Sequence, residues 1–290
     1  MRSAVCRRCN GRSGAADTEV KEDDDTRVDP DRCNSDVRSC LRHSRSLARY
    51  DAARRSDVAG DGIGGNDARR GRGCHRLCNI TAAGRSHGQK LSGLDLSGLD
   101  LSAAILRGAR LNRTKLRDAK LDRAILDQAW LVEADLSRAS LTSASIFAAQ
   151  MQRATLDGAN LSGARITADL TGARLVGTLL TGANLSADMK NQSMGLMRAV
   201  LKSSNLERAV LRDADLSRVD LEFASLKNAD LTNASLRGAA LGGATLARVT
   251  FNGTDFNGAD LASTRLIEPI GLDAAKNFDK AQNIDRLLRE

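Results

Sequence analysis

The chain has 290 residues, of which 41% are hydrophobic, yet it holds only five Phe, one Tyr and one Trp, and its net charge is +8. Two Pro against 25 Gly exclude collagen-like and Pro-rich chains, and no run of 18 apolar residues exists that could form a membrane-spanning helix. An ordinary globular core of this size would bury more aromatic rings. We therefore expect a soluble chain, with no transmembrane segment, whose interior is built in an unusual way.

Residues 1–90 differ in composition from the rest of the chain. They carry a net charge of +6, whereas the residues from Leu91 onward carry +2. Their few large apolar residues follow neither helical nor strand spacing, so this segment cannot bury enough apolar surface to offset the entropy of ordering it. We predict a disordered N-terminal extension over residues 1–90.

Three short patterns in this extension resemble functional motifs. The pairs Cys6–Cys9 and Cys74–Cys78 resemble metal ligands, but the 64 residues between them do not match a zinc-finger spacing. The run of residues 60–65 matches G-x-G-x-x-G, but no apolar strand precedes it. The arginines of residues 69–73 can attract phosphates, but no aromatic residue for base stacking lies nearby. We expect no metal, no cofactor and no nucleic-acid partner here.

Residues 1–10 lack the apolar region of a secretory signal, so we expect a cytoplasmic protein. The alternative is that the residues before about Leu77 are a misassigned start, which would hide a signal peptide. The pattern of these residues leaves both interpretations open.

From Leu91 onward, a large apolar residue returns at every fifth position and a small one, usually Ala, stands two residues before it. A period of five fits neither a helix nor a flat strand. In an extended segment, residues two apart point the same way, so the large and the small residue both face an interior. The remaining three positions of each five-residue unit must then include a turn that redirects the chain. Coils made of such sides can stack through backbone hydrogen bonds at the spacing of strands.

Units such as Ala134-Asp135-Leu136-Ser137-Arg138 and Ala229-Asp230-Leu231-Thr232-Asn233 resemble the pentapeptide-repeat family, whose unit is A-(D/N)-L-x-x. The resemblance extends from Leu91 to about Leu266. It implies an all-β fold, namely a right-handed quadrilateral β-helix, or pentapeptide-repeat solenoid, with four units in each coil. We assign this β-helix to residues 91–268.

The repeat is interrupted in two places. Ile166 and Leu170 are four residues apart, so the register slips back by one. Leu185 and Leu201 are sixteen residues apart, which is one more than three units. We expect a local bulge around residues 189–197, either an irregularity filled by adaptable Met side chains or a partner-binding protrusion. The candidate partner-binding residues are Met189, Lys190, Asn191, Gln192, Met194 and Met197.

Beyond Leu266 the apolar period lengthens to six, at Leu272, Phe278 and Ile284. An open end of a β-helix exposes unpaired backbone and apolar interior, so it needs a cover. We predict that residues 269–290 form a short, partly helical C-terminal cap. The alternative is a surface for a homodimer through the C-terminal end.

The repeat region contains neither His nor Cys, which excludes His-based acid/base catalysis, Cys nucleophiles and zinc sites from it. Eight of its Asp residues stand at the position before the central large apolar residue, where a role in the turn explains them. These residues are Asp95, Asp100, Asp135, Asp215, Asp220, Asp230, Asp255 and Asp260. We therefore expect that the protein is not an enzyme and needs no cofactor.

The leading hypothesis is a noncatalytic scaffold, a rigid rod that engages an unknown protein partner. The resemblance also suggests a second function, because some pentapeptide-repeat proteins bind type II topoisomerases (DNA gyrase) as acidic mimics of DNA. Leu91 to Leu266 carries 21 Lys plus Arg against 18 Asp plus Glu, which disfavours such mimicry. A third alternative is an enzyme with a carboxylate or metal site at the 189–197 interruption.

Overall fold

The computed structural model describes residues 90–187 and 198–289, whereas residues 1–89, 188–197 and 290 lie outside the described residues. The chain divides between Ala83 and Gly84. The disorder and the motifs predicted for the N-terminal extension, residues 1–90, therefore lie outside the described residues, apart from Lys90, which pairs with Arg110 and belongs to the first coil. For residues 1–89 the disorder and the motif interpretations stay predictions.

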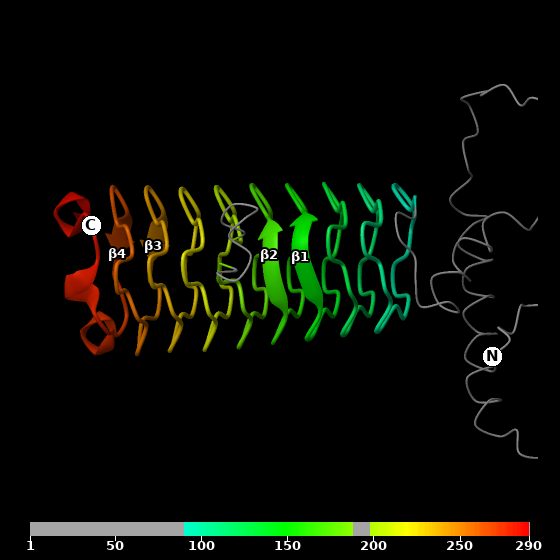
Figure 1. Ribbon diagram of the computed structural model, residues 1–290. Helices are drawn as coiled ribbons and strands as arrows, with labels where there is room; N and C mark the ends of the chain where they lie inside the picture. The colour runs from blue at the N-terminus through cyan, green and yellow to red at the C-terminus, as the bar shows by residue number, and fades with distance from the viewer. Residues whose placement is uncertain (1–89, 188–197, 290) are drawn as a thin grey trace, which may run out of the picture. The chain divides into compact units, whose positions relative to one another are not determined.

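The described residues form a stack of coils (Figure 1). Successive coils pair through parallel bridges between residues twenty apart, such as Lys90 with Arg110 and Asp95 with Lys115. The bridges recur every five residues, so four of them fall within each coil. The chain is thus a β-helix whose coils have four five-residue sides, as the repeat predicts. The right-handedness of the coil stays a prediction.

A β-turn joins each side to the next. The backbone N–H of Leu94 donates to the carbonyl oxygen of Leu91 at 3.3 Å, and Gly93, the third residue of this turn, has a φ of 74°. A positive φ at this position is the requirement of a type II turn. The equivalent residue is often not glycine: Arg113 and Arg123 have φ values of 56° and 58°. At its corners the stack therefore holds many residues other than glycine in the left-handed backbone conformation.

The interior of the stack consists of the repeated large and small apolar residues, which are buried as predicted. Where Thr replaces the small residue, its hydroxyl needs a partner in the interior. Thr114 donates to the carbonyl oxygen of Leu91 at 2.9 Å, and Thr254 to that of Leu231 at 2.7 Å. Each carbonyl belongs to the preceding coil, so these buried hydroxyl groups link neighbouring coils.

The four-residue step lies where strand β1 (Ser145–Gln150) pairs in parallel with β2 (Arg165–Asp169). Phe147 pairs with Thr167, but Gln150 pairs with Asp169, so one residue is lost between the two strands. The slip expected between Ile166 and Leu170 is confirmed.

The sixteen-residue step differs from its prediction. Arg165 bridges Asn184 and Asp169 bridges Val200. Arg165 and Asp169 begin consecutive sides of one coil, so Asn184 and Val200 begin consecutive sides of the next coil. The sixteen residues therefore take the place of a single side, and their interpretation as three units with one extra residue is wrong. Counting could not distinguish the two cases, because both leave the later phase unchanged.

The C-terminal residues form a last coil with longer sides. Strands β3 (Thr245–Ala247), β4 (Arg265–Ile267) and β5 (Leu288–Arg289) make one parallel sheet in that order. The sides of the last coil contain the 3-10 helices η2 (Leu272–Ala274), η3 (Phe278–Lys280) and η4 (Ile284–Arg286). The bridges continue into this coil, for example from Asp255 to Lys276. The segment predicted as a cap is thus a continuation of the stack, and its helical part consists of 3-10 turns.

One extra residue explains the six-residue period. Asn277 and Asn283, with φ values of 53° and 56°, each follow a bridge residue and precede a large apolar residue. Their side-chain amides donate to Oδ1 of Asp255 at 2.8 Å and of Asp260 at 2.7 Å. The extra residue therefore also fastens the last coil to the coil before it.

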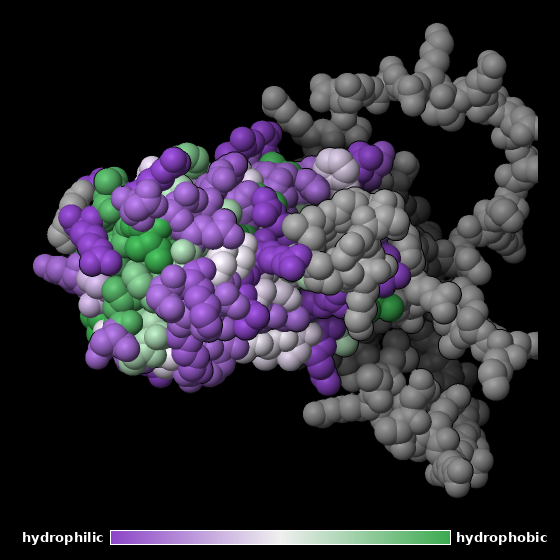
Figure 2. All heavy atoms as spheres, turned by 60° about the vertical axis from the view of Figure 1, so that its left-hand side comes forward, coloured by the Kyte–Doolittle hydropathy of each residue, from purple (hydrophilic) through white to green (hydrophobic). Residues whose placement is uncertain are grey.

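Aromatic rings fill the interior near this end. Phe256 lies 5.3 Å from Phe251 and 5.2 Å from Phe278, measured between ring centroids. Phe278 is only half-buried, and Ile270 and Leu288 are 50% and 49% exposed. Figure 2, in which this end comes forward, shows apolar surface there. Among the described residues, no helix is long and apolar enough to cross a membrane.

Candidate functional site

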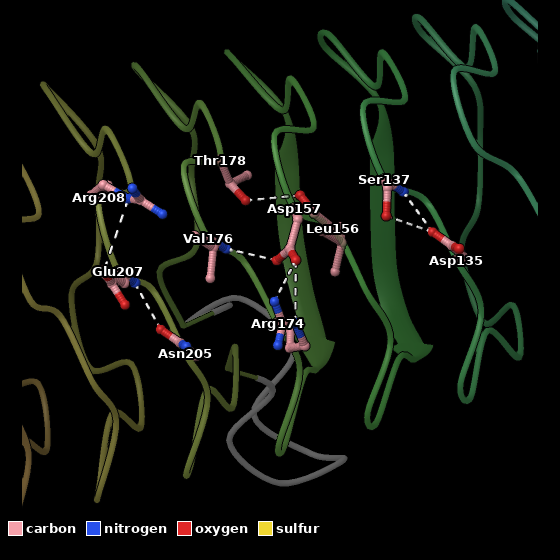
Figure 3. A network of polar contacts seen from close by, with 10 residues as sticks. All are labelled: Asp135, Ser137, Leu156, Asp157, Arg174, Val176, Thr178, Asn205, Glu207 and Arg208. Atoms are coloured by element: carbon pink, nitrogen blue, oxygen red, sulfur yellow. Dashed lines mark hydrogen bonds and ion pairs between the residues drawn. The ribbon is translucent and has the colours of Figure 1, made fainter.

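The repeated Asp and Asn residues accept hydrogen bonds from the turn that follows them. In Figure 3, Oδ1 of Asp135 accepts the backbone N–H of Ser137 at 3.1 Å and its hydroxyl at 2.6 Å. Oδ1 of Asn205 accepts the backbone N–H of Glu207 at 3.0 Å. Every Asp singled out in the sequence makes the same bond to the N–H two residues later. The turn role predicted for these residues is confirmed.

Carboxylates next to the turns pair with arginines of a neighbouring coil. Oδ2 of Asp157 accepts a hydrogen bond from Nη2 of Arg174 at 2.8 Å, while its Oδ1 accepts the backbone N–H of Val176 at 3.0 Å (Figure 3). Arg138 and Asp118 form two such bonds, both of 2.8 Å. Within residues 90–187 and 198–289, no group of three His, Cys, Asp or Glu residues is placed to hold a metal ion.

The predicted partner-binding residues, Met189, Lys190, Asn191, Gln192, Met194 and Met197, lie outside the described residues. The structure places only the chain on either side of them. After the gap, Nη2 of Arg198 lies 3.0 Å from Oδ2 of Asp220, a carboxylate whose side chain is only 8% exposed. This ion pair fixes the chain as it rejoins the stack. The proposed protrusion stays a prediction.

One side of the stack combines two exposed aromatic side chains, Trp130 at 50% and Phe223 at 64% exposure. We call this side the tryptophan face, meaning its bridge residues and the three residues that follow each of them, of which the third lies at the corner. The bridge residues are, in order along the stack, Lys90, Arg110, Trp130, Gln150, Asp169, Val200, Asp220, Ala240 and Asp260.

Trp130 borders an open hollow of about 530 Å³ on the tryptophan face. The other residues that line it are Ser92, Gly93, Asn112 and Val132, together with a row of charged side chains formed by Arg113, Glu133 and Arg153. Oδ1 of Asn112 accepts the backbone N–H of Val132 at 3.0 Å, which fixes the floor between two coils. An exposed indole beside a hollow is typical of a residue that anchors a protein interface.

The charged row beside this hollow runs along the corner of three successive coils. Glu133 stands between Arg113, at 2.8 Å from Nε to Oε2, and Arg153, at 2.6 Å from Nη2 to Oε1. The hydrogen bonds from Arg113 and then Arg153 hold the pKa of Glu133 below its ordinary value of 4.5. Because one carboxylate is shared by two guanidinium groups, the row carries a net positive charge at neutral pH.

Phe223 lies further along the same corner. Its φ is 60°, an uncommon backbone conformation for a bulky residue. A Cβ atom on Gly243 would lie 2.6 Å from the Phe223 ring, so the ring covers this glycine of the next coil. Gly243 has a φ of 67° and no side chain, and both properties are needed here. Phe223 therefore stands beside a flat area of backbone and small residues.

Carboxylates outnumber cations along the part of the face that contains Phe223. Nζ of Lys202 lies 2.7 Å from Oε2 of Glu222, and this hydrogen bond, with the nearby charge of Asp220, raises the pKa of Lys202. Asp260 lies further along the face and accepts hydrogen bonds only from neutral groups, Ala262 and Asn283, among the described residues. The two halves of the tryptophan face thus differ in charge.

Sequence analysis missed Trp130 and Phe223. Both occupy outward positions at which the repeat normally has polar residues or glycine. Reading the outward positions for large apolar residues, as well as the inward ones, would have found them. It would not have placed both on one face, because the two interruptions between them change the count of residues per coil.

Comparisons with known proteins agree with this architecture. The family model described as pentapeptide repeats matches in eight copies, at residues 95–131, 119–163, 148–186, 196–233 and 229–266. No curated protein matched the chain. Because the family model covers more than half of the chain, the protein belongs to the pentapeptide-repeat family.

Several solved structures are similar to the chain. HetL, a pentapeptide repeat protein involved in heterocyst differentiation regulation in the cyanobacterium Nostoc, is 30% identical with a TM-score of 0.31, covering 66% of this chain and 88% of HetL. QnrB1, a plasmid-mediated fluoroquinolone resistance protein, is 16% identical with a TM-score of 0.42. The match covers 66% of this chain and 92% of the QnrB1 chain. A pentapeptide repeat protein of the Arabidopsis thaliana thylakoid lumen is 24% identical with a TM-score of 0.19, covering 45% of this chain and 66% of its own.

Proposed function

We propose that the protein is a noncatalytic scaffold that binds another protein through the tryptophan face. The observation that carries this proposal is the exposure of Trp130 and Phe223 on one side of the stack. Each of these rings costs free energy in contact with water, and large aromatic residues are enriched among the residues that dominate binding energies. A stacked β-helix holds them at a fixed separation, so a partner loses little entropy in matching them.

The chemistry of the described residues supports a binding function over a catalytic one. The regularly placed carboxylates are occupied by the turns or by arginines, as Asp157 is by Val176 and Arg174. A general acid or base needs a carboxyl group free to reach a substrate. The alternative of an enzyme with a site at 189–197 concerns residues outside the described ones.

The DNA-mimic alternative requires a continuous acidic surface. Along the corners, arginines neutralise the carboxylates, as Arg138 does for Asp118 and Arg113 for Glu133. No described face is acidic over its whole length, since even the tryptophan face begins with Lys90 and Arg110. We therefore do not propose a topoisomerase as the partner.

Affinity capture with matched baits tests the proposal. The full chain, a variant with Trp130→Ala and Phe223→Ala, and a control with Leu179→Ala serve as baits in a lysate of the source organism. Leu179 is 40% exposed on another side of the stack. We expect a protein that the wild type and the control retain and the double variant loses. Identical retention by all three baits contradicts the proposal, and so does turnover of a substrate by the purified chain.

The last coil keeps its own predicted role. Its inward residues Phe278 and Ile284 are half-buried, and Leu288 is exposed. A homodimer through the C-terminal end would cover them and stays a prediction.

A further inference from the structure

The tryptophan face is divided by charge along its length. In its first half, Lys90 and Arg110 form no ion pair among the described residues, and the row of Arg113, Glu133 and Arg153 adds one more net positive charge. The second half contains four carboxylates, at Asp169, Asp220, Glu222 and Asp260, against the two cations Arg198 and Lys202. Opposite charges therefore lie at the two ends of one face.

The two halves also differ in shape. The first half presents the Trp130 indole beside a hollow of about 530 Å³. The second half presents a flat area of small residues, Ala240, Gly242 and Gly243, with the Phe223 ring at its edge. A protruding ring with excess positive charge and a flat area with excess negative charge are complementary surfaces.

We infer that the tryptophan face binds the same face of a second copy of this chain, with the two stacks antiparallel. This inference rests on the proposed function, because it names the partner of the same face. The two-fold axis lies between the two faces and perpendicular to the stacks, so it reverses the order of the coils. The bridge residues of one copy then lie opposite the bridge residues of the other, which is the arrangement of an isologous dimer. Each basic half then meets the acidic half of the other copy.

One register satisfies both charge and shape. When Trp130 lies opposite Ala240 of the second copy, the equal spacing of about 4.8 Å between coils fixes all other pairs. Arg110 then faces Asp260, and Arg153 at the corner faces the Phe223 ring, an arrangement that allows a cation–π contact. In the same register Asp169 faces Val200 of the second copy, and Lys202 lies two residues after Val200 in the same coil. No pair of like charges stands directly opposite in the bridge row.

The size of this face predicts a weak association. Eight coils at about 4.8 Å and a side of roughly three extended residues give a surface of about 40 by 10 Å. The total area buried by two copies is then roughly 800 Å², at the low end of specific interfaces. We expect a dimer whose population depends on protein concentration and falls with added salt, because charges at its two ends contribute to binding.

The single Trp of the chain makes this inference testable. Sedimentation and Trp130 emission are measured on the full chain over the same concentration series. We expect a monomer–dimer equilibrium and a shift of the emission to shorter wavelength with the same midpoint, because pairing removes water from the indole. A chain that stays monomeric overturns the inference. A dimer whose Trp130 emission is unchanged, as pairing through the C-terminal end would give, also overturns it.

Charge exchange tests the register. Arg110→Glu and Asp260→Lys each place like charges opposite one another at two sites of the dimer, so each is expected to raise the dissociation constant at least about tenfold. The double variant restores the pairs and is expected to return to within about threefold of the wild type. Arg123→Glu makes the same charge change on another side and is expected to leave dimerisation unchanged. Failure of the double variant to recover, with unchanged thermal unfolding, overturns this register and with it the proposed pairing.

These results are distinguishable from those that test the proposed function. If the chain stays monomeric but the capture experiment yields a foreign protein that depends on Trp130 and Phe223, the inference fails and the scaffold proposal stands. If neither a second copy nor a foreign protein binds this face, both fail.

Discussion

The regular coils and the last coil build the same kind of interior with sides of different length. A regular coil pairs with the coil before it and with the coil after it. Its inward residues, such as Leu136, are completely buried. The last coil bridges only the coil before it within the described residues, and its inward residues Phe278 and Ile284 are half-buried. Apart from the two interruptions, the coils that pair with a neighbour in both directions are built from five-residue sides. A coil with one neighbour can accept an extra residue and a 3-10 turn.

The largest difference between the two regions is expected for a charge placed in the interior. Leu136→Asp puts a carboxylate among apolar side chains with no partner, so we expect a loss of about 5 kcal/mol or more in the free energy of unfolding. Ile284→Asp places the same group where water can reach it, and we expect a loss of about 1 to 2 kcal/mol. Chemical denaturation of the two variants measures both values. Equal losses would show that the last coil is as closed as the regular ones.

The aromatic residues near the C-terminal end give the next largest effect. Phe256→Ala removes a completely buried ring that contacts Phe251 and Phe278, and we expect a loss of about 3 to 5 kcal/mol. Phe278→Ala removes a half-buried ring and is expected to cost about half as much. Thermal unfolding of both variants checks the order. A larger effect for Phe278 would mean that the last coil carries much of the stability of the stack.

Acid is expected to loosen the attachment of the last coil. Burial raises the pKa of Asp255, but hydrogen bonds from Asn277 and the backbone N–H of Asn257, together with the charge and hydrogen bond of Arg237, outweigh it and hold the pKa below the ordinary value of 3.8. The stabilising contribution of Asp255 is therefore complete above pH 3.8 and is lost as the pH falls below that value through the folded-state pKa. Hydrogen exchange of the Lys276 N–H, which donates to Thr254 at 2.7 Å, measures this.

The variant Asp255→Asn supplies the control for this pH dependence. It keeps an oxygen acceptor but cannot ionise, so the Lys276 N–H should exchange faster than in the wild type at neutral pH and without the acid-dependent step at this site. An unchanged acid-dependent step in the variant would assign the titration to another group.

The smallest effects are expected on the outer surface of the regular coils. Arg138 and Asp118 form a bidentate ion pair with exposed side chains, so Arg138→Asp removes this pair and places two carboxylates together. We expect a small loss of stability that decreases with added salt. Arg123→Asp, at an equivalent corner without a described ion pair, is expected to be nearly neutral. Equal effects of the two variants would show that the ion pair contributes nothing.

The repeat made the interior predictable from the sequence. Positions such as Leu136 and Ala139 recur with one period, and a coil of four sides needs that period to bury them. The Asp residues before the central Leu were also predictable, because an Asp two residues before a turn N–H can accept its hydrogen bond. The side-chain pairs between coils do not follow from the repeat alone, because Arg138 and Asp118 become neighbours only in a coil of four units, which the family resemblance implied and the bridges show.

The outward surface could not be derived from the repeat, since the repeat leaves those positions free. Trp130 and Phe223 break its polar pattern, but their common face depends on the one residue lost before Leu170 and on the sixteen residues from Leu185 to Leu201. Counting gave the phase of the later units correctly and the number of sides incorrectly. Only the bridges between coils settle which side each residue occupies.

The bridges also have a consequence for how fast the chain folds. Nearly every bridge joins residues nineteen to twenty-three apart, and the bridges across the second interruption join residues thirty-one apart, as Arg174 does with Asn205. Residues 90–187 and 198–289 therefore lack the distant pairings that make most all-β proteins slow folders, because ordering a coil closes only a short loop. The longer loop at the interruption is less than twice the usual length, so its extra closure cost is below about 0.6 kcal/mol. Folding that starts in any coil can spread in both directions with only a small delay at that step.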